Sequence, residues 1–296
     1  SARSFRVSSI PNLFSYSLHV DCEKGLVRLL ADRQKDNEFH VRGPPLNADH
    51  RLEPNAVLPK VIGHRGAAGH APENTLSGLR KAHELGATWV EFDVMLTAEG
   101  TPVLIHDETL GRTTDGKGRL TDHRWEDLRG LDAGAWFGPA FRGERVPSLH
   151  QALAVLGHLG LGANVEIKPA NDQDATTGVI VAKTLQESWP ANLPAPLLSS
   201  FSEKALAAAA DQAPEFPRAL LVGKVPDDWQ ARCDSLGATG LHAGARHLTE
   251  KQARRVIDAG YALRVYTVND QAVADRLFTW GAESVFSDYP DRITPP

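Results

Sequence analysis

The sequence is poor in cysteine and contains no long apolar run. Only Cys22 and Cys233 occur among 296 residues, which is too few for a disulfide framework, and their spacing matches no zinc motif. We therefore expect two unpaired thiols in a reducing compartment. No apolar stretch approaches the ~18 residues that a membrane span requires, so we expect no stable insertion into a membrane.

A large excess of either charge is also missing. The chain carries 32 Lys and Arg against 37 Asp and Glu, a formal net charge of -5, and its basic residues form no run. This balance predicts neither a nucleic-acid partner nor attraction to an anionic membrane surface. What the chain does have is 42% hydrophobic residues. That is enough to bury a substantial core in one large domain or two small ones.

Residues 1–58 differ in pattern from the rest of the chain and carry no chemical motif. The first 17 residues hold six Ser and two Arg but no acid, a composition found in organelle-targeting segments. A polar leader is the simpler interpretation, so we expect a cytoplasmic protein, with targeting through residues 1–20 as the alternative. A loop is predicted at residues 43–45 and one short helix near 24–33. We assign this N-terminal extension no function.

From residue 59 to residue 296 the chain alternates between strand and helix patterns, which predicts one domain. Short apolar segments bounded by turn residues predict strands, and amphipathic segments with capping residues predict helices between most of them. The expected strands are 60–64, 89–94, 102–106, 164–168, 196–201, 218–222, 239–243, 263–268 and 284–288. Helices are expected at 74–86, 202–212, 249–260 and 270–281, with Asn74, Ser202, Thr249 and Asn269 or Asp270 as N-caps.

Repeated strand–helix units of this length predict a parallel sheet, and eight of them predict a TIM barrel. Nine strand candidates are one too many. The turn around Glu99 and Gly100 is too short for a parallel crossover, so the second and third strands should form a hairpin. A turn centred between these two residues would place Asp93 opposite His106.

Three acidic residues lie in apolar strand segments. Glu91 and Asp93 are two residues apart on one strand, so both carboxylates point to the same face, while Phe92 points towards the helices. Two buried carboxylates repel each other unless a proton or a cation lies between them. A hard divalent cation, Mg²⁺ or Ca²⁺, is the natural partner. Glu166 and Lys168 share a face of another strand, either as a structural ion pair or as a third metal ligand with a phosphate contact.

His64 and His106 end two of the predicted strands. Active sites of TIM barrels lie at the C-terminal ends of the strands, so the two rings together predict a general base and a general acid for displacement at phosphorus. Arg65 offers a fork of donors for phosphate oxygens. At the start of the next helix, Asn74 is expected to be a structural cap, and Glu73 to orient groups that touch the substrate.

The segments HRG, APENT, VEFDV, LIHD, NVEIKP, LLSSF and YTVN follow in this order from about Pro59 to Pro296. With this spacing they resemble the glycerophosphodiester phosphodiesterase family, most closely its bacterial cytosolic branch. The resemblance implies a TIM barrel of the phospholipase C-like phosphodiesterase type with a small insertion at about residues 107–150, over the glycerol site. It implies hydrolysis of glycerophosphodiesters, such as glycerophosphocholine, to sn-glycerol 3-phosphate and an alcohol.

The resemblance also implies a role for each matching residue. His64 and His106 would form the acid/base pair, and one divalent cation would be bound by Glu91, Asp93 and Glu166. Phosphate contacts would come from Arg65 and Lys168, and Tyr266 would be an aromatic residue near the substrate. The chain departs from the family at Ala243, Gly244 and Ala245, where larger or polar residues are usual.

The predicted reaction is a metal-assisted displacement. One histidine takes the proton of the glycerol 2-hydroxyl and the other protonates the leaving alcohol, so that a cyclic phosphate forms and water then opens it. Direct attack by water activated by the cation is the competing route, and the order of the two histidines stays open. The alternatives are a phosphodiesterase for lysophospholipids or phosphoinositides, a non-catalytic barrel that binds phosphate, and an isomerase or aldolase. An isomerase or aldolase would usually need a Schiff-base lysine or a Gly-rich phosphate loop late in the chain, and Gly281 with the turn at residues 287–290 does not form such a loop.

Overall fold

The computed structural model describes residues 3–5, 16–21, 26–31 and 58–296. The chain divides into two compact units, Ser1–Ala48 and Asp49–Pro296. The first unit contains an antiparallel sheet of three strands in the order β1-β2-β3: β1 (Arg3–Phe5), β2 (Tyr16–Asp21) and β3 (Leu26–Ala31).

The short helix predicted near residues 24–33 is wrong where the structure describes that segment. Leu26–Ala31 forms the strand β3, which pairs with all six residues of β2. An isolated helix of this length is marginal in water, whereas pairing with β2 gives the backbone of β3 its hydrogen-bond partners. The loop predicted at residues 43–45 lies outside the described residues.

The second unit is built from nine strands and eight α-helices among its described residues. The strands are β4 (Val61–Gly63), β5 (Trp89–Leu96), β6 (Pro102–Leu104), β7 (Gly162–Ile167), β8 (Leu197–Ser200), β9 (Arg218–Val222), β10 (Gly240–Gly244), β11 (Ala262–Tyr266) and β12 (Ser284–Ser287). The helices are α1 (Leu76–Glu84), α2 (Trp125–Leu128), α3 (Leu149–Leu159), α4 (Asp174–Ser188), α5 (Glu203–Gln212), α6 (Trp229–Leu236), α7 (Glu250–Asp258) and α8 (Gln271–Trp280).

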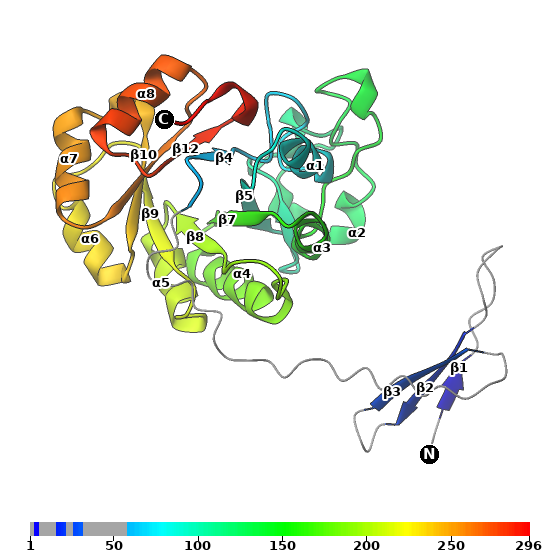
Figure 1. Cartoon of the computed structure of the whole chain (residues 1–296). Helices are drawn as coiled ribbons and strands as arrows, with labels where there is room; N and C mark the ends of the chain where they lie inside the picture. The colour runs from blue at the N-terminus through cyan, green and yellow to red at the C-terminus, as the bar shows by residue number, and fades with distance from the viewer. Residues whose placement is uncertain (1–2, 6–15, 22–25, 32–57) are drawn as a thin grey trace. The chain divides into compact units, whose positions relative to one another are not determined.

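Eight of these strands form a closed parallel barrel, which confirms the TIM-barrel prediction. Neighbouring strands follow the order β4-β12-β11-β10-β9-β8-β7-β5, and pairing between β4 and β5 closes the ring. The ninth strand, β6, pairs antiparallel with β5. The helices lie outside the strands (Figure 1). None of the helices in the described ranges is both long enough and apolar enough to cross a membrane.

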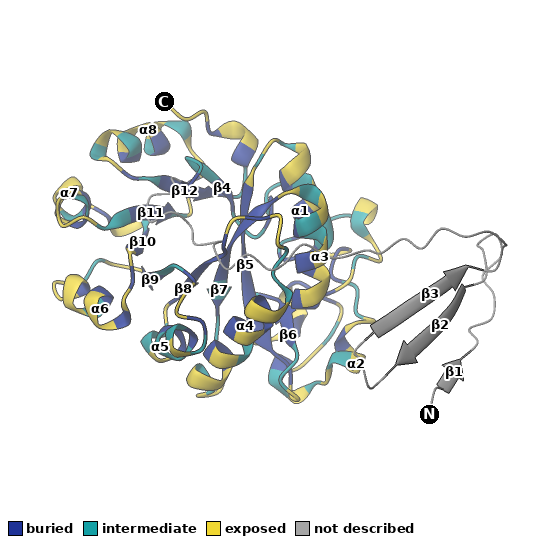
Figure 2. Ribbon diagram, turned by 60° about the horizontal axis from the view of Figure 1, so that its bottom comes forward, coloured by how far each residue is buried: buried dark blue, intermediate teal, exposed yellow. Residues whose placement is uncertain are grey.

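The strands are buried while the outward faces of the helices are exposed (Figure 2). Strand β5 is buried on both faces, and its residues alternate between two environments. Phe92 belongs to the main core, together with helix residues such as Leu79 and Leu153. Trp89 packs instead with Ile62 in a smaller apolar cluster. On the face of Trp89 the next residues are acidic, so this face of β5 changes from apolar to polar towards the C-terminal end of the strand.

The predicted hairpin of β5 and β6 is present, but its predicted register is wrong by one residue. Asp93 lies opposite Ile105, whose N–H donates to the Asp93 carbonyl oxygen at 3.2 Å. Thr97 and Thr101 close a loop of three residues rather than two, and Gly100 in that loop has φ 87°. A three-residue hairpin loop with a left-handed glycine is a common alternative to the two-residue turn. It shifts the whole pairing by one position.

Between β6 and α3 lies the predicted insertion, with α2 and three single-turn helices, Leu110–Arg112, Leu120–Asp122 and Pro139–Phe141. It has its own apolar core, which joins it to the hairpin through Met95 and Val103. This packing holds the segment after His106 over one side of the barrel end. Cys233 is a free thiol in α6, as predicted, and it is buried, whereas Cys22 lies outside the described residues.

Candidate active site

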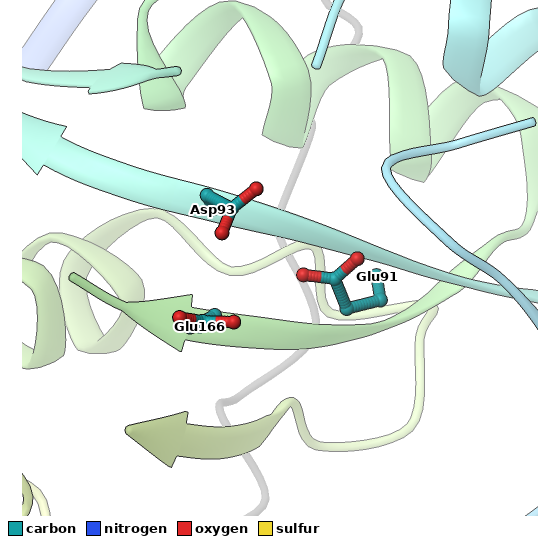
Figure 3. Close-up of side chains that lie close together, drawn as sticks. All are labelled: Glu91, Asp93 and Glu166. Carbon is teal, nitrogen blue, oxygen red and sulfur yellow. The ribbon is translucent and has the colours of Figure 1, made fainter. Parts of the chain in front are cut away.

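Three carboxylates come together inside the barrel. Glu91 and Asp93 lie on β5 and Glu166 on the neighbouring strand β7, where Asp93 and Glu166 are directly paired in the parallel register. One oxygen from each side chain lies within 4.8 Å of the others, and all three are buried. Figure 3 shows the three side chains on these adjacent strands. The sequence periodicity predicted this shared face for two of them, and strand pairing adds the third.

Burial and mutual repulsion perturb the acidity of the three carboxylates. Burial, together with the charges of Asp93 and Glu166, raises the pKa of Glu91 well above its ordinary value. Burial and the charge of Asp93 raise the pKa of Glu166 to about 8. One buried oxygen of Glu166, Oε1, has no hydrogen-bond partner. Such a cluster is favourable only when positive charge is added, so it can hold a divalent cation, and its all-oxygen donor set suits a hard ion.

Two basic side chains border this cluster. The Arg65 Nε atom lies 3.4 Å from an oxygen of Asp93, and the Lys168 Nζ atom lies 3.4 Å from the other. Burial would raise the pKa of Asp93, but the charges of Lys168 and Arg65 hold it below its ordinary value. Lys168 is also 4.0 Å from Glu166. This position fits both interpretations of Lys168, as the partner of Glu166 in an ion pair and as a phosphate contact.

His64 follows β4 and is held by Asp288, which follows β12. The distance from His64 Nδ1 to the Asp288 carboxylate is 2.6 Å, and Nε2 lies 3.9 Å from Glu91. Burial would raise the pKa of Asp288, but its hydrogen bond to His64 lowers it below the ordinary value. An ionised Asp288 has no proton to give, so the His64 Nδ1–H must donate. The Nε2 atom therefore points its lone pair or proton at the carboxylate side of the site.

His106 has the same arrangement with a different partner. Its Nδ1 atom is 2.6 Å from the carboxylate of the adjacent Asp107. Hydrogen bonding to Arg112 holds the pKa of Asp107 well below its ordinary value, so Asp107 accepts and the His106 Nδ1–H donates. Burial lowers the pKa of His106 below its ordinary value, which disfavours the charged ring. Although His106 is not directly opposite Asp93, its ring lies close enough that the protonated form lowers the pKa of that carboxyl.

Asn74 is not the cap of α1, contrary to the prediction. Thr75 is the N-cap, and its side chain accepts from the Gly78 N–H. Asn74 is buried with φ 56°, and it holds Asp93 from two sides. Its amide nitrogen donates to the Asp93 carboxylate at 2.8 Å, and its amide oxygen accepts from the Asp93 N–H at 3.1 Å. The cap belongs to Thr75 because only there is the backbone extended, as an N-cap requires.

Glu73 lies beside this cluster and accepts from Arg65 at 2.7 Å and from Arg112 at 2.8 Å. Tyr266 lines a pocket together with His64, Glu91 and Glu166. Its hydroxyl donates to the Val222 carbonyl oxygen at 2.9 Å, which fixes the ring at the pocket wall. All ten residues singled out in the sequence thus surround one barrel end, and their individual roles stay predictions.

The sequence interpretation missed several residues at this site. Asp107 stood next to His106 in the LIHD segment, and Asp288 directly follows the last barrel strand, where functional residues of these barrels gather. Arg112 and His242 gave no such indication. His242 lines the same pocket as Tyr266, whereas Ala243, one of the positions that depart from the family, faces the outer core. That substitution therefore does not alter the pocket wall directly.

Comparisons with known proteins agree with this geometry. The model of the "Glycerophosphoryl diester phosphodiesterase family" matches residues 64–292. A glycerophosphodiester phosphodiesterase of Bacillus subtilis is 30% identical over 260 residues, which cover 81% of this chain and 86% of that protein. Human glycerophosphodiester phosphodiesterase 1 is 47% identical over 96 residues, 32% of this chain and 29% of that protein.

Solved structures give the same result. A phosphodiesterase of Oleispira antarctica, in complex with the product sn-glycerol-3-phosphate, is 40% identical with a TM-score of 0.78, and the match covers 80% of this chain and 95% of that one. A glycerophosphodiester phosphodiesterase of Agrobacterium tumefaciens is 29% identical with a TM-score of 0.64, covering 79% and 98%. The chain therefore belongs to the glycerophosphoryl diester phosphodiesterase family and is a phosphoric diester hydrolase.

Proposed function

We propose that the protein hydrolyses small-molecule glycerophosphodiesters to sn-glycerol 3-phosphate and an alcohol, with His64 and His106 as the general acid/base pair. One observation supports this most. Two histidines, each with its Nδ1 atom held by a carboxylate, border a buried acidic triad. Each ring then has its Nε2 atom free to move a proton, which is the arrangement that general acid–base catalysis needs.

The phosphate would be bound between the basic side chains and the triad. Arg65 and Lys168 both lie 3.4 Å from Asp93, so their donors are already gathered where a phosphate oxygen would sit. Glu73 holds the guanidinium of Arg65 at 2.7 Å, and this orients the remaining N–H groups of Arg65. Tyr266 would form the part of the pocket wall that contacts the substrate.

Glu91, Asp93 and Glu166 would hold one divalent cation, Mg²⁺ or Ca²⁺. When bound, this ion would neutralise phosphate charge and lower the pKa of the glycerol 2-hydroxyl. Asn74 would keep Asp93 in place for that purpose, because it fixes both the carboxylate and the backbone of Asp93. The unpartnered Glu166 oxygen would gain the partner that it lacks.

In the proposed sequence one histidine accepts the proton of the glycerol 2-hydroxyl through its Nε2 atom, and the other donates a proton to the departing alcohol. The 2-hydroxyl oxygen bonds to phosphorus as the bond to the alcohol oxygen breaks, which leaves a cyclic phosphate. Water then opens the ring with the two histidines in exchanged roles. The carboxylates of Asp288 and Asp107 stabilise each ring when it carries the extra proton.

The test is release of sn-glycerol 3-phosphate from glycerophosphocholine with Mg²⁺, with Ca²⁺ or with EDTA. We expect His64→Ala to lose about 10²–10⁴-fold in rate, while His83→Ala, at an exposed position of α1, stays at the wild-type rate. Activity that survives both EDTA and His64→Ala would refute the mechanism. Unchanged release from a 2-deoxy substrate would remove the cyclic phosphate and leave direct attack by water.

The alternatives predict different outcomes of the same assay. A phosphodiesterase for lysophospholipids or phosphoinositides would release product from those lipids in preference to glycerophosphocholine. A non-catalytic barrel would bind sn-glycerol 3-phosphate without turnover from any diester. The perturbed carboxylates and the two carboxylate-held histidines favour catalysis, because a binding site gains nothing from paired proton carriers. The cytoplasmic location stays a prediction.

A further inference from the structure

Arg112, in the insertion, makes four side-chain hydrogen bonds beside the site. The proposed mechanism gives this residue no role. Its guanidinium donates to both oxygens of Asp107, at 2.5 and 3.1 Å. It also donates to both oxygens of Glu73, at 2.8 Å each. Two such paired contacts use four of the five N–H groups of the planar guanidinium, and a lysine cannot reproduce them.

The two carboxylates that Arg112 joins differ in how firmly they are held. Glu73 is only 11% exposed and is already paired with Arg65 at 2.7 Å. Asp107 is more exposed, at 25%, and among the described residues its carboxylate bonds only Arg112 and His106. Arg112 therefore links a fixed carboxylate of the barrel unit to one that would otherwise be free to turn.

We propose that Arg112 is a positioning residue that sets the orientation and the tautomer of His106 by fixing Asp107. The proposal rests on the proposed function, in which His106 moves a proton through Nε2. If the Asp107 carboxylate turned away, the His106 ring would lose the acceptor that keeps its proton on Nδ1, and Nε2 would no longer be reliably free. Removing Arg112 leaves the pair of Glu73 and Arg65 in place, so phosphate binding should persist.

The contacts of Arg112 with Glu73 and Asp107 differ from an ordinary surface ion pair. Isolated exposed ion pairs contribute little to stability, and the chain offers one for comparison. Arg119, in the same insertion, is 46% exposed against 44% for Arg112, and it bonds Glu108 and Asn171 rather than any residue of the site. It provides a matched control, because both changes remove one half-exposed arginine from the same segment.

The test measures kcat and KM for glycerophosphocholine in Arg112→Ala and Arg119→Ala. We expect Arg112→Ala to lose about 10–100-fold in kcat with KM changed by less than about threefold, and Arg119→Ala to match the wild type. Millimolar guanidinium should restore part of the lost rate, since the Arg112 head group is solvent-accessible. In a His106→Ala background, Arg112→Ala should cause no further loss. Arg112→Lys, which keeps the charge but not the fork, should stay impaired.

Nitrogen-15 shifts of the His106 ring give a readout that does not depend on turnover. We expect the share of the Nδ1–H tautomer to fall in Arg112→Ala and to stay unchanged in Arg119→Ala. The inference is overturned by an unchanged tautomer share, by full kcat in Arg112→Ala, by a loss confined to KM, or by an equal loss without His106. If Arg112→Ala shows the tautomer change but the wild-type protein releases no glycerol 3-phosphate, the proposed function is overturned instead.

Discussion

Glu166 makes the stability of the cation-free barrel depend on pH in a direction that can be worked out. The pKa of this carboxyl rises from 4.5 to about 8 on folding, chiefly through burial. Between about pH 4.5 and 8 the folded protein therefore keeps a proton that the unfolded chain has released. The stabilisation from the neutral carboxyl is fully present below about pH 4.5. The contribution is lost as the pH rises to about 8, and a shift of this size corresponds to on the order of 5 kcal/mol. The raised pKa of Glu91 acts in the same direction.

The measurement is urea unfolding in EDTA at several pH values from 5 to 8, for the wild type and Glu166→Gln. All six tryptophans lie after residue 88, so tryptophan fluorescence reports on the barrel unit. The wild type should become less stable as the pH rises, whereas the variant, which cannot ionise, should be several kcal/mol more stable than the wild type at pH 8. Glu126→Gln, at an exposed position, should retain the wild-type pH dependence.

Adding Mg²⁺ or Ca²⁺ completes the experiment. A cation at 100 times its dissociation constant stabilises the folded state by about 2.7 kcal/mol. This gain should grow as the pH rises through 8 in the wild type, because the ion displaces the Glu166 proton, and it should shrink in Glu166→Gln. If wild type and Glu166→Gln show the same stability from pH 5 to 8 in EDTA, Glu166 is ionised in the folded protein. The argument from burial would then be refuted.

Three further variants test the arrangement around the site. Asp288→Asn should lower the rate of glycerol 3-phosphate release by about 10–100-fold, because His64 loses the acceptor that fixes its ring; an unchanged rate would show that Asp288 plays no such part. Asn74→Ala should destabilise the barrel unit by about 3 kcal/mol in urea unfolding, since two buried hydrogen bonds to Asp93 are lost, and a loss below about 1 kcal/mol would contradict that view. Gly66→Ala should lower the melting temperature markedly, because Gly66 has φ 86° and an added Cβ would lie 2.6 Å from the backbone of α1; unchanged melting would refute this.

Much of the site could be predicted because it follows strand periodicity. Alternation along β5 places Glu91 and Asp93 on one face whatever the rest of the fold does. The barrel prediction then brings any polar residue at a strand end to the same place, which is how His64, His106 and Glu166 were identified. Here local pattern and global architecture agree, so reasoning from short segments was sufficient.

Other features depended on local geometry that a sequence pattern leaves open. Whether the hairpin loop has two or three residues is decided by Gly100 adopting a left-handed conformation, and this moved the partner of Asp93 from His106 to Ile105. Asn74 and Thr75 are both good caps by residue type. Only the backbone conformation at each position assigned the cap to Thr75 and freed Asn74 to hold Asp93.

The sequence by itself determined the barrel, the paired carboxylates on β5 and the two histidines at strand ends, because these depend on periodicities of two and 3.6 residues. The tertiary structure alone decided how those groups are held. Asp288 is 224 residues from His64 and Arg112 is 39 from Glu73, and nothing local specifies such pairs. The physical reason is that closing the barrel joins its first and last strands, and packing of the insertion places Arg112 beside Glu73. These long-range contacts set the orientation and acidity of side chains that the sequence could identify but not position.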